Sequence, residues 1–345
     1  MGLRDEIHEQ PEILQRLIEE RWEHIQEVAA DIRRRRIDYA FLAARGTSDH
    51  AGLYAKYLWG AYNQLPVALA TPSLFSLYRL PPRLGPALVV GISQSGQSPD
   101  IVNVLEEGRR QGKLTLAITN APTSPLAATA ELMIHIDAGV EEAVAATKTY
   151  TAQLTTIALL SVALREDTAS LNVLRRLPDR LAQALALEPE IARAAQRYRY
   201  MEQCVVLGRG FNYATAFEWA LKMKELSYTV VTAYSSADFQ HGPIAMVARG
   251  FPVFAVVPSG AVFEDVLALL KRLKEKHQVE LFVISDRQQA LDLADTGLLL
   301  PEDVPEWLSP IVSIVPAQLF CYHLTRAKGF DTERPRSLSK VTKTQ

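Results

Sequence analysis

The sequence is poor in cysteine, lacks long apolar runs and carries almost no net charge. Its two cysteines, Cys204 and Cys321, lie inside apolar stretches without CxxC spacing. This argues against a disulfide framework or a zinc site and predicts buried, unreactive thiols. No apolar run approaches the roughly 20 residues that span a bilayer, and residues 1–11 are too charged for a secretion signal. We therefore expect a cytoplasmic protein that makes no membrane contact.

A net charge of −2 in 345 residues offers no general attraction to nucleic acid. The basic cluster at residues 33–36 closes a predicted helix, where the helix dipole favours cations. The seven histidines show no HxxxH or HExxH pairing, so no metal is implied. With 48% hydrophobic and 22% charged residues, the chain is long enough for two domains that each bury a core.

Strand-length apolar runs, each followed by a turn and a helical pattern, occur twice in the same order. The segments match at an offset of roughly 165 residues. They are 41–46 with 205–210, 89–96 with 254–260, 116–120 with 282–286, and 132–136 with 298–301. Such βαβ repeats predict an α/β fold of two tandem doubly wound, flavodoxin-like parallel-sheet domains. The expected parts are N-terminal helices over 1–36, a first domain over 37–170, a helical connector over 171–200, a second domain over 201–328 and a polar tail over 329–345.

Hydroxyl groups crowd the loops after the first two strands of the first copy, where open parallel sheets bind ligands. One loop is Gly46-Thr47-Ser48, and the other is residues 93–98 (SQSGQS), ahead of a helix that we expect to begin near Asp100. Hydroxyls, a glycine and N–H groups at a helix start suit a phosphate monoester without lysine or Mg²⁺. A serine that only caps its helix is the simpler alternative, but caps do not explain several hydroxyls in two adjacent loops.

The corresponding loops of the second copy, 208–210 and 257–260, contain fewer hydroxyls, which indicates a depleted site. The glycine pair at 208–210 is followed by Tyr213 where a dinucleotide fingerprint needs a small residue, so NAD binding is not expected.

Residues 214–228 have helical periodicity and carry Glu218, Lys222 and Glu225. Lys222 follows Glu218 by four residues, and Glu225 follows Lys222 by three. The apolar stripe beside this trio is Phe217, Leu221 and Tyr228. Taken alone, the trio is most simply an exposed, salt-bridged helix face. The loop 235–243 that follows holds His241 before Gly-Pro. A histidine on such a turn is placed as exposed catalytic histidines are, although a single loop histidine is usually structural.

Together these segments resemble the sugar isomerase (SIS) family, in particular the isomerase half of glucosamine-6-phosphate synthase and its stand-alone deaminase relatives. The matching segments follow the family's order and cover nearly the whole chain. They are 6–11 (EIHEQP), 46–48, 93–98 with Asp100, 145–148, 207–210, 220–228, 241–243 and 335–340.

The resemblance implies a role for each site residue. Glu225 would carry a proton between C1 and C2 of the sugar, and Lys222 would steady Glu225 and the developing enolate. Lys340 would meet the open-chain carbonyl. His241, reaching in from the neighbouring subunit of a homodimer, would open the sugar ring. The phosphosugar would be held by Gly46, Thr47, Ser48, Ser93, Gln94, Ser95, Ser98, Val144, Ala146 and Ser339. Aldose–ketose interconversion needs only such a carboxylate, histidine and cation, so we expect no cofactor.

The departures from the synthase favour a catabolic reaction. Met1-Gly2 leads directly into the isomerase half, so we expect that glutamine is not the nitrogen donor. Residues 237–240 (ADFQ) and 341–345 (VTKTQ) differ from the synthase's Gly-Glu-Leu-Lys and Ser-Val-Thr-Val-Glu, and Ala146 replaces a substrate-binding serine.

The leading hypothesis is an isomerising deaminase of an amino-sugar 6-phosphate. Glucosamine 6-phosphate is the leading candidate substrate. The alternatives are an isomerase or deglycase of another substituted ketose phosphate, or a synthase-like aminating isomerase that uses free ammonia. A non-catalytic phosphosugar sensor is less consistent, because about 36 residues before the first strand are too few for a DNA-binding domain.

Overall fold

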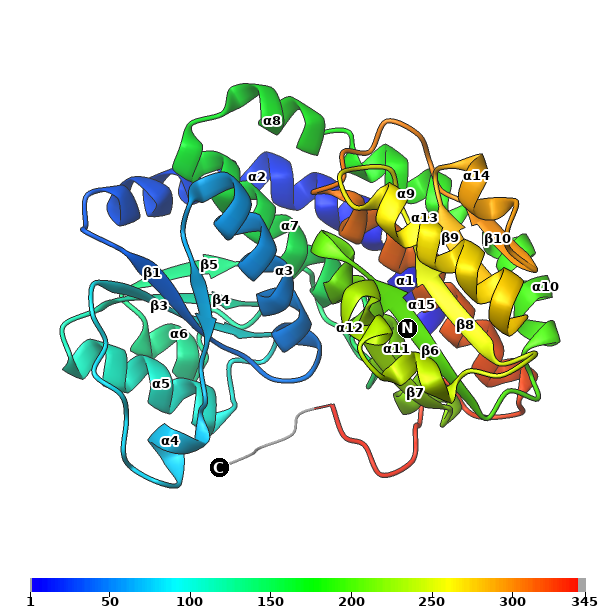
Figure 1. Cartoon of the computed structure of the whole chain (residues 1–345). Coiled ribbons are helices and arrows are strands. Elements are labelled where there is room, and N and C mark those ends of the chain that lie inside the picture. Colours follow the sequence, from blue (N-terminus) through cyan, green and yellow to red (C-terminus); the bar gives the residue numbers. More distant parts are fainter. Residues whose placement is uncertain (1, 341–345) are drawn as a thin grey trace. The chain divides into compact units, whose positions relative to one another are not determined.

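A computed structural model describes residues 2–340, which form helices around two parallel sheets (Figure 1). The chain divides into two compact units. The first-sheet unit contains residues 9–142, 146–178 and 339–340, and the second-sheet unit contains residues 2–8, 143–145 and 179–338. Among residues 2–340, no helix has the length and apolar character needed to cross a membrane.

The first sheet has five parallel strands in the order β2-β1-β3-β4-β5. The strands are β1 Tyr39–Ala43, β2 Val67–Leu69, β3 Ala87–Ser93, β4 Leu114–Thr119 and β5 Leu132–His135. The helices are α2 Gln10–Arg33, α3 Thr47–Asn63, α4 Ser73–Ser76, α5 Pro99–Arg110, α6 Pro125–Thr129, α7 Lys148–Arg165 and α8 Thr168–Leu174. Helices α2 and α3 pack against α7 on one side of the sheet, and α4 and α6 pack against α5 on the other (Figure 1).

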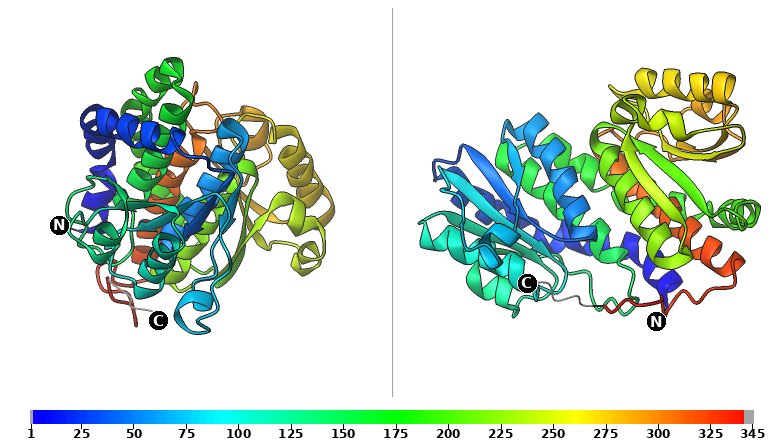
Figure 2. Two further views of the ribbon diagram at one scale, coloured as in Figure 1. Left: turned by 90° about the vertical axis from the view of Figure 1, so that its left-hand side faces the viewer. Right: turned by 60° about the horizontal axis from the view of Figure 1, so that its bottom comes forward.

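The second sheet has the order β10-β9-β8-β6-β7. Its strands are β6 Gln203–Gly208, β7 Val230–Ser235, β8 Pro252–Val256, β9 Glu280–Ser285 and β10 Thr296–Leu299. The helices of this unit are α1 Leu3–His8, α9 Leu177–Leu185 (which begins in the other unit), α10 Glu188–Arg197, α11 Tyr213–Ser227, α12 Ser236–Gln240, α13 Phe263–Arg272, α14 Gln288–Leu291 and α15 Ser309–Ala327. Short helical turns are Gly210–Asn212, Pro243–Met246 and Leu273–His277. Figure 2 shows α13 on one side of this sheet and α11 with α15 on the other.

The two sheets repeat one topology, because β7-β6-β8-β9-β10 is the strand-by-strand counterpart of β2-β1-β3-β4-β5. This 2-1-3-4-5 order is the flavodoxin-like one, so the predicted fold class is confirmed. The sequence repeat accounts for four strand pairs and misses the fifth, β2 with β7. Strand β2 has only three residues, and in β7 (VVTAYS) buried and exposed residues alternate, so neither forms the continuous apolar run that marks the central strands.

The central strands are apolar on both faces, as expected for a parallel sheet covered by helices on both sides. All seven residues of β3 are buried. In the second-sheet unit, Trp219 of α11 packs among Phe254, Phe282 and Phe320, with ring centroids 5.2, 5.5 and 5.9 Å away. These rigid cores fix the strand ends from which the loops of the candidate site extend.

Helices and ion pairs mark the segments that surround the sheets. Pro11 lies in the first turn of α2, and residues 171–200 hold α9, α10 and part of α8. The basic cluster makes ion pairs, among them Arg33–Glu166 at 3.0 Å and Arg35–Glu131 at 2.6 Å. Cys204 and Cys321 are buried, and burial raises the pKa of both thiols, as predicted for unreactive cysteines.

One carboxylate joins three helices of the second-sheet unit. Glu188, at the start of α10, accepts hydrogen bonds from Arg4 and His8 of α1 and from His323 of α15, at 2.7, 2.9 and 2.9 Å. Burial alone would raise the pKa of Glu188, but these three hydrogen bonds outweigh it and hold the pKa at about 2, below its usual 4.5. The ionised carboxylate therefore stabilises the packing of α1 on α10 and α15.

Glu188→Gln should lower the free energy of unfolding by up to about 3 kcal/mol near neutral pH. A depressed pKa in the folded state stabilises the fold above the unfolded-state pKa, and this contribution is lost as the pH falls from about 4.5 toward 2. Chemical denaturation of wild type and variant across this range measures the difference, with the exposed neighbour Glu190→Gln as control. A wild-type advantage that stays constant down to pH 2 would show that Glu188 does not act through its charge.

Candidate active site

The loop after β3 presents hydroxyl groups at the carboxyl end of the first sheet. Ser93 Oγ accepts a hydrogen bond from Gly96 N at 3.1 Å, and Ser95 Oγ accepts one from Gln97 N at 3.3 Å. Ser98 is the N-cap residue of α5, but its side chain makes no capping hydrogen bond. The alternative that Ser98 merely caps its helix is therefore wrong, and its hydroxyl is available to a ligand at the start of a 12-residue helix.

Gly96 gives this loop its path. Its φ is +61°, and a Cβ at this position would lie 2.1 Å from Ser124 Oγ and 3.2 Å from Thr119 Oγ1. Glycine favours this left-handed backbone conformation, and only a residue without a Cβ lets the loop pass so close to Ser124. The Gly96 carbonyl accepts a hydrogen bond from Leu126 N at 3.2 Å, so the loop is fixed before any ligand arrives.

The loop after β1 is joined by a charged contact to the first turn of α5, which follows the loop after β3. Arg45 Nε donates to Asp100 Oδ2 at 2.7 Å, and the Asp100 side chain is fully buried. Ser48, in the first turn of α3, is buried and accepts a hydrogen bond from Gln153 Nε2 of α7 at 3.0 Å. Ser48 and the 93–98 loop thus belong to the same compact unit, and the common cradle stays a prediction. The sequence patterns assign no role to Arg45 or Gln153.

Replacing Ser95 and Ser98 with alanine together should weaken phosphosugar binding by about 3 to 6 kcal/mol, because two hydrogen bonds to a charged group are lost. The unfolding transition should not change. Titration calorimetry with a sugar 6-phosphate measures the affinity. Ser259→Ala, at the position equivalent to Ser95 in the second copy, is the matched control. Equal affinities for the double variant and the wild type would exclude the 93–98 loop as the phosphate site.

The equivalent loop of the second sheet is filled by the protein's own carboxylates. Glu306 Oε2 accepts a hydrogen bond from Ala261 N at 2.7 Å, and a Cβ on Gly260 would lie 2.2 Å from the Glu306 carboxyl group. Asp286 accepts from Ser259 N and Ser259 Oγ at 2.6 and 2.5 Å. The first copy has neutral Asn120 in place of Asp286, and its side chain turns away to Ala138 and Gly139. Two negative charges thus give a physical reason for the depleted character of the second copy.

We therefore expect one bound phosphosugar per chain. Titration calorimetry should give a stoichiometry of one, because an incoming phosphate at residues 259–261 would have to displace Glu306 and approach Asp286. Glu306→Gln removes one charge and should leave the high-affinity site unaltered. Two equivalent sites per chain would contradict the difference between the two copies.

Helix α11 buries its charged residues, contrary to the simpler prediction of an exposed salt-bridged face. Lys222 and Glu218 are 1% and 0% exposed, and Glu225 is 22% exposed. Lys222 Nζ lies 2.5 Å from Glu225 Oε2 and 3.4 Å from Glu218 Oε1. The predicted apolar stripe is also wrong, since Phe217 and Leu221 are only half-buried. The reason is that α11 packs against α15, β6 and β7, which cover the charged side as well.

His241 follows α12 on a turn and is exposed, as predicted. Its backbone N donates to the carbonyl of Asp238 at 3.0 Å, and Gly242 after it has a φ of +123° that only glycine adopts readily. Residues 236–240 form the short helix α12, where the sequence predicts a loop. His241 is therefore exposed to solvent at the C-terminal end of a short helix.

Lys340, in the C-terminal tail, contacts a carboxylate that no sequence motif marks. Its Nζ lies 2.6 Å from Glu141 Oε2 in the first-sheet unit. Glu141 precedes the family-like segment 145–148, but it lies in irregular structure, where no periodic pattern reveals it. The other residues that the resemblance implies are less buried. Thr47, Val144 and Ala146 are half-buried, and Ser339 and Gly46 are exposed.

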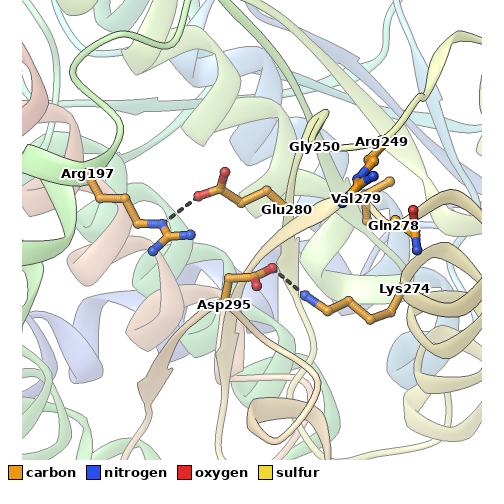
Figure 3. A pocket seen from close by; sticks show the side chains of 8 residues that line it. All are labelled: Arg197, Arg249, Gly250, Lys274, Gln278, Val279, Glu280 and Asp295. Atoms are coloured by element: carbon orange, nitrogen blue, oxygen red, sulfur yellow. Dashed lines mark hydrogen bonds and ion pairs between the residues drawn. The ribbon is translucent and has the colours of Figure 1, made fainter.

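A separate hollow of about 420 Å³ lies at the amino ends of β8, β9 and β10 (Figure 3). Two ion pairs lie within the hollow, since Arg197 Nε lies 2.6 Å from Glu280 Oε1 and Lys274 Nζ lies 2.5 Å from Asp295 Oδ2. Ligands of open parallel sheets bind at the opposite, carboxyl ends, so this hollow is not the candidate site. Within residues 2–340, no group of three His, Cys, Asp or Glu side chains is placed to hold a metal ion.

Residues 35–163 and 199–327 each match the SIS domain family. The isomerizing glutamine–fructose-6-phosphate aminotransferase of Thermus thermophilus is 35% identical over 97% of this chain, and that of Bordetella parapertussis is 37% identical over 88%. The chain spans 57% and 51% of these two relatives, or about half of their length.

Solved structures show the same likeness. The C-terminal domain of glucosamine-fructose-6-phosphate aminotransferase from Francisella tularensis has a TM-score of 0.87 at 29% identity, over 96% of this chain and 98% of that one. A Silicibacter pomeroyi protein, provisionally named a phosphosugar isomerase, has a TM-score of 0.85 at 33% identity, over 96% and 100%. Glucosamine-6-phosphate deaminase from Thermotoga maritima, at 21% identity and a TM-score of 0.75 over all of both chains, shares the fold. With two SIS domains in tandem and relatives named as phosphosugar enzymes, the chain belongs to the SIS domain family of sugar isomerases.

Proposed function

We propose that this chain is an isomerising deaminase that converts glucosamine 6-phosphate to fructose 6-phosphate and ammonia. The observation that carries the proposal is the charged trio of α11. Burying ions is costly, and a helix that needed only stability would place apolar side chains at Glu218 and Lys222. The trio instead leaves Glu225 partly exposed beside a buried ammonium, an arrangement suited to a carboxylate that moves protons.

The proposed reaction moves one proton and then adds water. His241 assists ring opening, and Glu225 removes the proton on C2 of the open-chain amino sugar. Lys222 stabilises the negative charge that develops, and Glu225 returns the proton to C1. A proton also passes from the nitrogen to O1, so the product is a neutral imine at C2. Water adds to the imine carbon, the C–N bond breaks and ammonia leaves, so that fructose 6-phosphate remains.

We assign the 93–98 loop and Ser48 to the phosphate and Lys340 to the open-chain carbonyl. His241 is exposed on its own unit, which supports its proposed contribution to the site of a neighbouring subunit in a homodimer. We propose that Val144, Ala146 and Ser339 line the sugar. The domain limits 37–170 and 201–328 stay predictions. The family model matches the slightly different ranges 35–163 and 199–327.

The cysteines within this chain are not suited to glutamine hydrolysis by this chain itself. Glutamine hydrolysis of the synthase type uses a nucleophilic thiolate. Cys204 and Cys321 are both buried, and burial raises the pKa of both. One alternative has its own support, because relatives at 35% identity are named aminotransferases. The same site run in reverse would aminate fructose 6-phosphate with free ammonia.

An ammonia-release assay over a panel of amino-sugar 6-phosphates tests the proposal. Release should be fastest from glucosamine 6-phosphate, with fructose 6-phosphate formed in equal amount and no glutamate formed from glutamine. If fructose 6-phosphate and ammonia are converted to glucosamine 6-phosphate but ammonia release from every amino sugar stays below detection at the concentrations assayed, the aminating alternative is favoured. If the chain neither deaminates an amino-sugar phosphate nor aminates fructose 6-phosphate, the deaminase proposal and the aminating alternative are both wrong.

A further inference from the structure

Glu141 is a carboxylate that four donors surround. The side chain is fully buried in the irregular segment before α7. Its Oε1 accepts from Thr147 N and Thr149 N at 2.9 and 3.1 Å, and its Oε2 accepts from Thr149 Oγ1 at 2.9 Å and from Lys340 Nζ at 2.6 Å. The two N–H groups belong to the start of α7, where a helix favours negative charge. Glu141 therefore joins the start of α7 to the C-terminal tail.

Helix α7 also supports the proposed phosphate cradle. Gln153 is four residues beyond Thr149, or about 6 Å further along the helix axis. Gln153 is 1% exposed, and its Nε2 donates to Ser48 Oγ. The same helix thus holds Ser48 through Gln153 and the tail lysine through Glu141, and all of these residues belong to the first-sheet unit.

The Glu141–Lys340 contact differs from a purely structural ion pair in the same unit. Lys148 is 2% exposed and its Nζ lies 2.6 Å from Glu9 Oε2. Its ammonium is therefore buried and cannot reach a ligand in solvent. Lys340 is 24% exposed, and Glu141 keeps three other hydrogen bonds if the lysine moves. An unsatisfied buried carboxylate is costly. Because Glu141 keeps its other hydrogen bonds, the lysine can shift toward a substrate without that cost.

We propose that Glu141 is a positioning residue for Lys340. Its carboxylate holds the tail ammonium at the start of α7 until the open-chain sugar is present and receives it again after product release. This inference rests on the proposed function, since it assigns Glu141 to the residue that meets the sugar carbonyl. Glu141 itself does not touch the sugar.

A double-mutant cycle separates positioning from a structural role. In wild type, Glu141→Gln should lower kcat by about tenfold or more, because an amide does not hold the ammonium. In a Lys340→Met background the same change should have no effect on the residual rate. Thr149→Val removes one hydrogen bond to the same oxygen and leaves the ion pair, so it should change kcat less than about threefold. An equal loss in both backgrounds, or no loss in either, would overturn the proposal.

A second measurement needs no turnover. An amine-reactive acylating reagent, read by peptide mass spectrometry, should modify Lys340 several-fold faster in Glu141→Gln than in wild type or Thr149→Val. An unchanged rate overturns the proposal. If wild type turns over no phosphosugar, the proposed function fails, while the labelling rate still decides whether Glu141 holds Lys340.

Discussion

Glu225→Gln should lower turnover by roughly 10² to 10⁴-fold while the substrate still binds. An amide cannot accept and return a proton, so the variant loses general base catalysis but keeps the shape of the side chain. If Glu225 were only the ion-pair partner of Lys222, the change would lower the free energy of unfolding and leave turnover intact. Initial rates of ammonia release, with affinity measured separately by calorimetry, distinguish the two cases.

Glu264→Gln on α13 is the matched control, since Glu264 is an exposed carboxylate of the same unit. It should be indistinguishable from wild type. A Glu225→Gln variant with near-normal turnover would place the proton carrier elsewhere and remove the role assigned to α11.

Lys222→Met should lower the free energy of unfolding by about 3 to 5 kcal/mol. The ammonium lies 3.4 Å from Glu218, whose side chain is fully buried. Replacing it with an apolar side chain removes a positive charge that stabilises this buried carboxylate. Turnover should fall as well, because Lys222 also contacts Glu225. Urea denaturation measures the stability loss.

The exposed Lys224→Met on the same helix is the control and should cost less than about 0.5 kcal/mol. The double variant with Glu218→Gln and Lys222→Met should recover part of the lost stability, because neither buried charge remains. If Lys222→Met alone is as stable as wild type, the trio is not energetically coupled.

The fold could be predicted from the sequence because the signal is repeated. The apolar runs of β3 and β4 are marked by continuous burial, and the same runs recur in β8 and β9. Strands β2 and β7 are less continuous, so the repeat does not reveal them. The helix boundaries of α2 and α11 follow from Pro11 and from the 3.6-residue periodicity of residues 214–228.

The candidate site could be predicted only where its residues cluster along the chain. The loops at 46–48 and 93–98 are visible as runs of hydroxyls. The burial of Lys222 is not, because i, i+4 charges have the same spacing on an exposed face as on a buried one. Glu141 and Lys340 lie 199 residues apart, and Glu306 reaches Ala261 across 45 residues. Such contacts depend on the tertiary fold and leave no local pattern.

Hydrogen exchange at C1 of fructose 6-phosphate in D₂O tests the central claim, that the chain moves a proton between C1 and C2, most directly. Proton NMR should show that wild type replaces one of the two C1 hydrogens with deuterium, while Glu225→Gln exchanges at least about 10²-fold more slowly. Glu264→Gln should exchange at the wild-type rate. If wild type binds fructose 6-phosphate by calorimetry but, with ammonia present, neither exchanges a C1 hydrogen nor transfers it to C2 of glucosamine 6-phosphate, the chain does not carry out this proton transfer, and the proposed function is wrong.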